Sequence, residues 1–335
     1  FSNSEKDPTT SGCGNVSVHL SNIALDNLTM DEQGFALGTK GRSLYRIIDK
    51  HGNVERIYTS PDPIQGLHVM PEGTIILSTD VDRWSPTTPN TIYRSQNAGK
   101  SFEVIKTING GCALSWSMAS DANGNLFLGE YGPRGVGFSK NVWKSLDNGD
   151  SWHLIFRAPN VDGVHIHRVA VDPFTNFLWI THGDQAHSGY HGIYRSEDHG
   201  MTWARVRDSQ ATAVAFTKEA IYWGEDTYRG VVTRYERLTQ QFETVLEAHS
   251  IGYGGSVYDM VVGLHGCIYT PMVKYETHSF LPSVWIGKGT EWNLLLEVPA
   301  EENQFAGLTH ISTPDRFGVI HTSGYVFVQQ AASSQ

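Results

Sequence analysis

The chain repeats a short pattern three times, and an internal repeat limits the possible folds more than any other sequence feature. The copies are IYRSQNAGKSFEVI from Ile92, VWKSLDNGDSWHLI from Val142 and IYRSEDHGMTWARV from Ile193. They share the order aromatic–basic–Ser–x–Asp/Asn–x–Gly–x–Ser/Thr–aromatic, and their serines lie 50 and 51 residues apart. Each copy predicts a strand, a tight polar turn and a second strand, because the Asp or Asn can accept backbone N–H bonds while the Gly adopts positive φ. We expect the final Trp or Phe to pack between neighbouring sheets.

This repeat resembles the Asp-box, or BNR repeat, of sialidase-type β-propellers. Two copies match it in full, with Ser145, Asp147, Gly149, Ser151 and Trp152 in one, and Ser196, Asp198, Gly200, Thr202 and Trp203 in the other. The first copy departs from it at Asn97 and Phe102. In the families that carry them, Asp-boxes are structural turns remote from the active site. The resemblance therefore implies a fold and says little about chemistry.

A second pattern covers most of the chain: an apolar strand, a turn, and another apolar strand that ends in polar residues. Seven copies follow one another at spacings of about 45 residues. They begin at Ile23, Ile64, Ser115, His165, Thr212, Ser256 and Phe305. Frequent Gly, 11% aromatic residues and only 18% charged residues are typical of a turn-rich β protein.

Together these patterns predict an all-β fold, a single seven-bladed β-propeller of four-stranded antiparallel blades, with six or eight blades as alternatives. We expect residues 14–330 to form the propeller, 1–13 an N-terminal extension and 331–335 a C-terminal tail. The last blade, which ends at GYVFVQ, lacks a good fourth strand. The segment from Gly14 to Ser21 could supply that strand, close the ring and remove an exposed sheet edge.

Propeller geometry converts the strand pattern into a list of candidate site residues. The two innermost strands of a blade are antiparallel, so the start of the first and the end of the second lie at the same mouth of the central channel. Six of the fifteen histidines fall at such positions: His68, His165, His167, His182, His310 and His321. The other residues expected there are Asp80, Arg83, Trp116, Glu130, Tyr131, Asp184, Glu225, Asp226, Tyr258 and Lys274, with Arg134, Tyr228 and Arg229 just beyond. A merely solvated rim would also be polar but would contain little His, so this composition favours a functional mouth.

A metal site is one interpretation of the histidines. His165 and His167 lie two apart on one strand, so they should point the same way, and His182 on the partner strand could join them. Convergent imidazoles can bind a transition metal, with Glu130 or Asp184 completing the shell. They can equally serve as a general base and a donor, and a structural role competes for each His. We expect at most a divalent cation (Ca, Zn or Mn) and no organic cofactor.

Our first functional hypothesis is a polysaccharide lyase that acts on a uronate-containing chain by β-elimination. The reaction needs a group that neutralises the carboxylate, a base for the adjacent C–H, and an acid for the leaving oxygen. The candidates are, for the base, His167 or His182; for the acid, Tyr131 or Tyr228; and for the neutralising group, Arg229, Arg134 or a bound cation. Substrate contacts are expected from His68, Asp80, Arg83, Trp116, Arg134, Glu225, Lys274, His310 and His321. The set is similar in architecture to that of some propeller polysaccharide lyases.

Two other classes stay open. A glycoside hydrolase could use a carboxylate pair drawn from Glu130 and from Glu225 with Asp226, although the Arg-Ile-Pro motif of true sialidases is missing. A non-catalytic propeller that binds glycan or protein would not need so many His and acidic residues.

Charge and cysteine content limit the partners and the compartment. The net charge is −10, and Lys and Arg form no cluster, which argues against nucleic acid; no apolar run suits a membrane span. A first residue that is not Met, and the sequons at Asn15 and Asn27, suggest a secreted, glycosylated monomer. Cys13, Cys112 and Cys267 allow at most one intrachain disulfide, and buried free thiols are an equal alternative.

Overall fold

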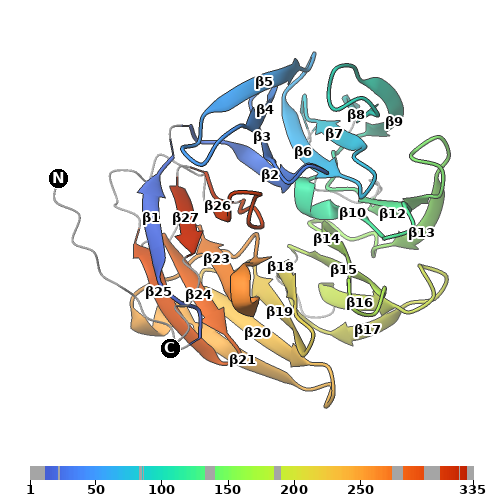
Figure 1. The fold of residues 1–335 in the computed structure, drawn as a ribbon. Coiled ribbons are helices and arrows are strands. Elements are labelled where there is room, and N and C mark those ends of the chain that lie inside the picture. The colour runs from blue at the N-terminus through green and yellow to red at the C-terminus, as the bar shows by residue number, and fades with distance from the viewer. Residues whose placement is uncertain are drawn as a thin grey trace.

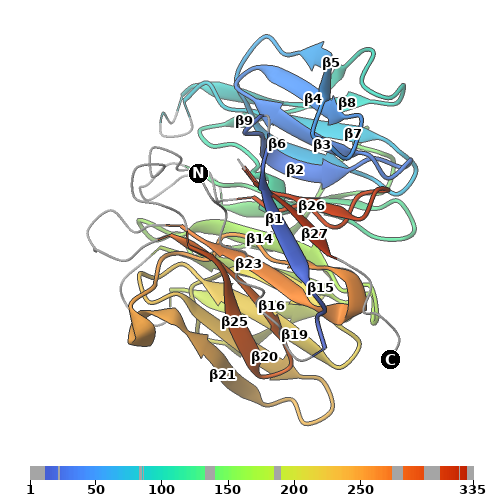
Figure 2. The same ribbon diagram turned by 60° about the vertical axis from the view of Figure 1, so that its left-hand side comes forward.

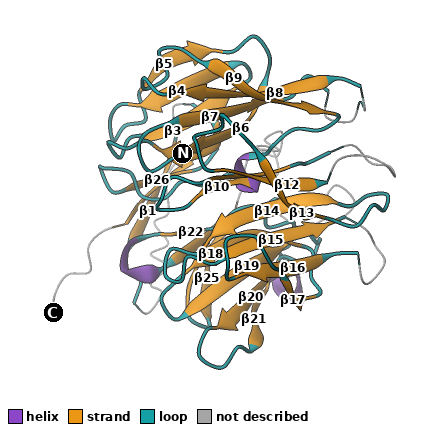
Figure 3. Ribbon diagram, turned by 90° about the vertical axis from the view of Figure 1, so that its right-hand side faces the viewer, coloured by secondary structure: helices purple, strands orange, loops and turns teal. Residues whose placement is uncertain are grey.

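Seven small β-sheets form a ring around a central channel in the computed structural model (Figure 1). The predicted seven-bladed propeller of antiparallel blades is therefore confirmed. The structure describes residues 12–21, 23–82, 85, 87–132, 140–184, 190–273, 282–297, 310–323 and 325–329. Strands account for nearly all regular structure in the described residues (Figure 3), alongside short 3₁₀ turns at Ser115–Ser117 (η1), Ala248–Ile251 (η2) and Leu264–Gly266 (η3). Within these residues no helix has the length and apolar character that crossing a bilayer requires.

Six blades have four strands each, in chain order from the channel outward. Blade 1 contains β2 (Asp26–Met30), β3 (Ala36–Lys40), β4 (Ser43–Ile47) and β5 (Val54–Thr59). Blade 2 contains β6 (Ile64–Val69), β7 (Ile75–Thr79), β8 (Pro89–Ser95) and β9 (Glu103–Asn109). Blade 3 contains β10 (Met118–Ser120), β11 (Leu126–Gly129), β12 (Asn141–Ser145) and β13 (His153–Arg157).

The second half of the ring repeats this arrangement. Blade 4 contains β14 (His165–Val171), β15 (Leu178–Gly183), β16 (Gly192–Ser196) and β17 (Ala204–Arg207). Blade 5 contains β18 (Ala211–Phe216), β19 (Ala220–Glu225), β20 (Val231–Glu236) and β21 (Phe242–Glu247). Blade 6 contains β22 (Val261–Val262), β23 (Ile268–Met272), β24 (Ser283–Lys288) and β25 (Glu291–Glu297). The core lies between adjacent blades, where their apolar faces pack on one another.

The ring closes in blade 7, which combines the two ends of the chain. β26 (Val319–His321) and β27 (Tyr325–Gln329) are C-terminal, and β1 (Val16–Leu20) pairs with β27 along five residues. Figure 2 shows β1 and β27 side by side. A bridge from Ile311 to Thr322 marks the innermost position of this blade. Closure by an N-terminal strand is thus confirmed, and it removes the free edge of β27.

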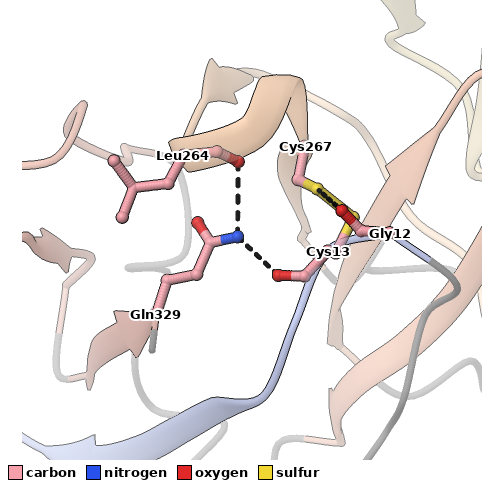
Figure 4. Close-up of a disulfide and its surroundings, with 5 residues drawn as sticks. All are labelled: Gly12, Cys13, Leu264, Cys267 and Gln329. Atoms are coloured by element: carbon pink, nitrogen blue, oxygen red, sulfur yellow. Dashed lines mark hydrogen bonds between the residues drawn. A yellow bond between two sulfur atoms is a disulfide. The ribbon is translucent and has the colours of Figure 1, made fainter. Parts of the chain in front are cut away.

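A disulfide holds the closing strand in place. Cys13, just before β1, is bonded to Cys267, just before β23 of blade 6 (Figure 4). The Gln329 side-chain amide donates to the Cys13 carbonyl at 2.6 Å and to the Leu264 carbonyl at 3.3 Å. Of the two alternatives for the cysteines, the single disulfide is therefore found, and Cys112 is a buried thiol. A disulfide of this kind is typical of proteins that fold in oxidising compartments.

The Asp-box turns of blades 2, 3 and 4 each pack against the preceding blade. The Ser145 hydroxyl donates to Asp147 Oδ1 at 2.8 Å and accepts the Gly149 N–H at 2.7 Å. Gly149 has φ 98°, and a Cβ there would lie 2.5 Å from Ile105 of β9, so only glycine fits. The Trp152 indole donates to the Ile105 carbonyl at 3.4 Å. The aromatic residue that ends the repeat therefore packs between neighbouring sheets, as expected.

The basic residue of the repeat also has a partner, which the sequence did not reveal. Arg94 donates to the Asn148 carbonyl at 2.8 Å, and Lys144 donates to the His199 carbonyl at 3.3 Å. Each carbonyl belongs to the Asp-box turn of the next blade. The turns of blades 2, 3 and 4 are thus linked in a chain.

One glycosylation expectation is wrong for the folded protein. Asn27 is 2% exposed and its amide donates to Thr39 Oγ1 at 2.8 Å, so it cannot carry a surface glycan. Asn15 is exposed.

Candidate functional site

Three side chains of blade 4 meet at one mouth of the channel. β14 begins with His165, and Asp184 directly follows the last residue of β15. His165 Nε2 lies 2.9 Å from Asp184 Oδ2, and His167 Nε2 lies 2.9 Å from Asp184 Oδ1. Both imidazoles are buried, whereas the Asp184 side chain is 21% exposed. These three residues, here called the His-His-Asp group, could hold a metal ion.

Local backbone features produce this convergence. The β14–β15 ladder shifts register between Ile166 and Arg168, which leaves His167 in a β-bulge, and bulges re-aim side chains next to functional sites. Residue 183 is a glycine, and a Cβ at this position would lie 2.8 Å from His167 Cε1, so a larger residue would displace the His167 ring. Asp184 has φ 81°, an uncommon conformation that turns its carboxylate back toward the two rings.

The charges of the group are coupled. Burial lowers the pKa of His165. Burial also opposes protonation of His167, but the negative charges of Asp184 and Asp226 outweigh it and raise the pKa of His167. For Asp184, burial is outweighed by the His167 charge and the two imidazole contacts, which hold its pKa far below the usual range. Asp184 is therefore an anion, and the group prefers a positive charge between its members.

Neighbouring blades contribute further groups. The Tyr131 ring, which follows β11, lies 4.0 Å from the His165 ring between centroids. On the other side, burial raises the pKa of Asp226, which bonds to the Tyr258 hydroxyl. Burial and the nearby Asp226 charge raise the pKa of Tyr258 as well. Phenols, a carboxyl and the His-His-Asp group thus meet across blades 3 to 6.

His182, the third expected metal ligand, lies outside this group. Successive residues of a strand point to opposite faces, and His182 of β15 pairs with Ile166, so it lies on the face opposite His165 and His167, beside Phe156 of blade 3. Its Nδ1 lies 3.0 Å from the Tyr190 carbonyl and its ring stacks on Tyr194. Burial lowers the pKa of His182 to about 4, so it is neutral. Asp184, one of the two carboxylates expected to complete the shell, lies in the group, and His182 does not.

Two other expected catalytic residues have partners elsewhere in the fold. Glu130 is 3% exposed, and its carboxylate accepts the Asn141 backbone N–H at 3.1 Å and the Trp143 indole N–H at 2.7 Å. This is a structural role within blade 3. Arg229 pairs at 2.9 Å with Glu247, the last residue of the outermost strand β21. Tyr228, a third expected catalytic residue, is exposed.

The expected substrate-binding residues are scattered. His68 lies near the end of β6 and not at its start, because the strand begins at Ile64; its Nε2 lies 2.9 Å from Ser120 Oγ. His321 is buried and bonded to Asp315 at 2.9 Å. Glu225 accepts the Ser209 hydroxyl at 3.2 Å. Asp80 directly follows β7. Arg83, Arg134 and Lys274 lie outside the described residues.

Two expected residues form an aromatic stack. Trp116 in η1 lies 5.8 Å from the Tyr258 ring and 5.0 Å from the His310 ring, both roughly parallel to it. His310 is buried, which lowers its pKa to about 4. The stack joins blades 3, 6 and 7.

The sequence analysis missed a buried ion pair in the channel. The Arg168 guanidinium donates to Asp259 Oδ1 at 3.0 Å and to the Thr212 carbonyl at 2.7 Å. Asp259 Oδ2 in turn accepts the Ile311 N–H at 3.3 Å. These bonds join blades 4 to 7. The only sequence signal was a charged residue within an apolar strand.

Comparison with known proteins supports the fold but does not assign the chain to a family. No protein-family model matches the chain, and no curated protein matches it. Many solved structures are similar, and two of them match at 11% identity and a TM-score of 0.61 each. One is a chain of the mitotic checkpoint complex, matched over 99% of both chains. The other is the extracellular domain of BT4673 from B. thetaiotaomicron, where the match covers 93% of this chain and 39% of that one. At this identity the likeness shows the propeller alone.

Proposed function

We propose that this protein is a secreted carbohydrate-active enzyme that cleaves an acidic, uronate-containing polysaccharide by β-elimination at the mouth between blades 3 and 6. The observation that carries the proposal is the buried His-His-Asp group with the Tyr131 ring packed against it. A group that holds positive charge beside a phenol supplies what β-elimination needs: carboxylate neutralisation and proton transfer.

The roles follow from the chemistry of the step. The base takes the proton next to the uronate carboxylate, the bond to the leaving oxygen breaks, a carbon–carbon double bond forms, and an acid returns a proton to that oxygen. A divalent cation (Ca²⁺, Zn²⁺ or Mn²⁺) on His165, His167 and Asp184 would neutralise the substrate carboxylate. Tyr131 is our candidate for proton transfer, and Asp226, whose pKa is raised by burial, is a second acid.

Three residues have partners that do not suit the roles the sequence suggested. His182 and Glu130 are engaged in structural hydrogen bonds, and Arg229 pairs with Glu247 of the outermost strand of blade 5. Tyr228 is exposed and stays a candidate acid. Trp116 keeps a proposed role in stacking on sugar rings, since it is half-buried beside Tyr258.

The partners and the compartment are part of the same proposal. The disulfide supports secretion, and the Asp-box turns support a place among sialidase-like propellers. We expect a monomer whose partner is a polysaccharide or oligosaccharide, and neither nucleic acid nor a membrane.

A glycoside hydrolase is the second candidate, favoured by one observation. The pKa of Asp184 is lowered and that of Asp226 is raised. Two carboxyl groups whose pKa values are pushed apart are typical of a hydrolase acid and its partner.

A panel of uronate polysaccharides tests the proposal, with ultraviolet absorbance reporting the unsaturated product ends. We expect turnover by the parent protein and a loss of about 10²- to 10⁴-fold in kcat for Tyr131→Phe, which keeps the ring against His165. Tyr253→Phe is the matched control, because this phenol bonds Glu297 at the perimeter. New reducing ends without absorbance would overturn elimination in favour of hydrolysis. Binding without turnover would overturn catalysis altogether.

A further inference from the structure

The atoms of the His-His-Asp group contact one another in a way that ordinary hydrogen bonding does not explain. His165 is 1% exposed, and its Nε2 lies 2.9 Å from Asp184 Oδ2 without an aligned hydrogen bond. The His321–Asp315 pair of blade 7 has the same 2.9 Å separation and does form one. Neither ring nitrogen of the buried His165 thus has a well-aligned hydrogen-bond partner among the described residues. A buried arrangement of this kind is costly unless a cation lies among the three residues.

The spacing suits a small metal ion. An ion at about 2.0–2.2 Å from each donor, with donor–metal–donor angles of 90–110°, places the donors about 3.0–3.5 Å apart. The two nitrogen–oxygen separations of 2.9 Å fall just short of that range. For these two pairs, entry of the ion therefore requires shifts of only a few tenths of an ångström, and all three ligand atoms lie within 4.8 Å of one another.

The donor types select the class of ion. Ca²⁺ and Mg²⁺ take oxygen ligands almost exclusively, whereas imidazole nitrogen suits first-row transition metals. We propose that His165, His167 and Asp184 bind one first-row divalent transition-metal ion, such as Zn²⁺ or Mn²⁺, and not Ca²⁺. Three protein ligands leave at least one coordination position for water or substrate, which is the pattern of catalytic and not structural zinc sites.

The backbone around the group is shaped for these ligands. The bulge at His167 and the absence of a side chain at Gly183 let the His167 ring lie against β15. An added Cβ at residue 183 would lie 2.8 Å from His167 Cε1 and 3.3 Å from its Nδ1. Gly183→Ala should therefore move the ring while leaving every donor atom in the chain.

This inference rests on the proposed function only for the role of the ion, since binding is measured without substrate. The full chain is stripped with a chelator, and Zn²⁺, Mn²⁺, Co²⁺ and Ca²⁺ are titrated separately by calorimetry. Co²⁺ absorbance reports the ligand set. We expect one equivalent of each transition ion and at least about 100-fold weaker binding of Ca²⁺.

Variants locate the site. We expect His167→Ala and Asp184→Asn to weaken Zn²⁺ binding by more than about 100-fold, and Gly183→Ala by about 10-fold. His182→Asn is the matched control, because its amide can still donate to the Tyr190 carbonyl and it should bind Zn²⁺ like the parent. Circular dichroism and thermal melting confirm that each variant is folded.

Three results would overturn the inference: no stoichiometric transition metal on folded parent protein, Ca²⁺ binding as tightly as Zn²⁺, or unchanged binding in both His167→Ala and Asp184→Asn. Metal binding without polysaccharide cleavage would refute the proposed function and leave the site intact. Cleavage by metal-free protein would refute the role of the ion in elimination and would leave the cleavage activity established.

Discussion

Loss of the Cys13–Cys267 disulfide should destabilise the protein by several kcal/mol, because this bond closes nearly the whole ring. The two cysteines are 254 residues apart in sequence. In the chain-entropy model, ΔS is about −2.1 − 1.5R ln n cal/mol/K, which for this separation gives about 5.5 kcal/mol at 25 °C. Measured effects often fall below such values, so we expect a loss of about 3–5 kcal/mol.

The perturbation is Cys13→Ala with Cys267→Ala, which removes both sulfur atoms and adds no buried hydroxyl. Urea unfolding measures the change, and with a slope of about 3 kcal/mol/M the midpoint should fall by about 1–2 M. Cys112→Ala is the control, because this thiol is buried but outside the disulfide. It should cost only about 1 kcal/mol for the small cavity.

Hydrogen exchange separates local from global effects. β1 pairs only with β27, so without the bond its amides should exchange through local fraying before the rest of the ring opens. The reasoning is refuted if the double variant stays within about 1 kcal/mol of the parent and the β1 amides keep their protection. In that case strand pairing, with the Gln329 hydrogen bonds, would be enough to close the ring.

Three further predictions concern single side chains. Burial lowers the pKa of His310 to about 4, so this ring stays neutral in the folded protein at a pH where it is protonated in the unfolded chain. The free energy of unfolding should therefore be unaffected above pH 6.5 and should fall by up to about 3 kcal/mol as the pH drops toward 4. His310→Gln should flatten that slope in urea unfolding at stepped pH, and an unchanged slope would contradict the assignment. Lys144→Met should lower the free energy of unfolding by about 1 kcal/mol, because it removes the hydrogen bond to the next Asp-box turn. Arg195→Met, the equivalent change next to a blade without such a turn, should lower it less, and equal losses would refute the link between turns. Glu130→Ala should lose about 2–4 kcal/mol, since two buried N–H groups lose their acceptor, yet bind Zn²⁺ normally; weakened Zn²⁺ binding at unchanged stability would return Glu130 to the site.

Much of the fold was predictable because it is periodic. Seven strand–turn–strand copies and three box turns fix the blade count, and the missing fourth strand of the last blade pointed to residues 14–21 as its completion. The bonds between boxes were not predictable in the same way. Arg94 and Lys144 occupy a recurring basic position, but their acceptors are backbone carbonyls about one repeat further along, and carbonyls leave no mark in a sequence.

The sequence predicted where the site residues lie along the strands but not which way their side chains point. The spacing of His165 and His167 predicted that their rings share a side, as they do. Strand ends also located His182 at this mouth, but its ring turns into the space between blades. Asp184 reaches the group through a positive φ just past the strand, a conformation that the residue type permits and does not reveal. Arg168 and Asp259, 91 residues apart, were marked only as charged residues in apolar segments, which does not reveal that they pair.

The β-bulge that contains His167 recurs in other blades, and in two of them the residue in the bulge has a structural role instead of a place in the candidate site. The innermost ladders of blades 1, 2, 4 and 5 share a register shift at the same place, which leaves Asn27, Gln65, His167 and Thr212 in the bulges. Asn27 accepts a hydrogen bond from the Ser115 hydroxyl of blade 3, and Thr212 donates one to the Val257 carbonyl of blade 6. Both side chains therefore join one blade to another. His167 instead meets an anion of its own blade, at an end where Gly183 leaves room for the ring. The repeat supplies the position in each case, and the side chain decides whether it fastens the ring or forms a site. The difference predicts that substitution of Thr212 lowers stability without affecting metal binding, while substitution of His167 affects binding first.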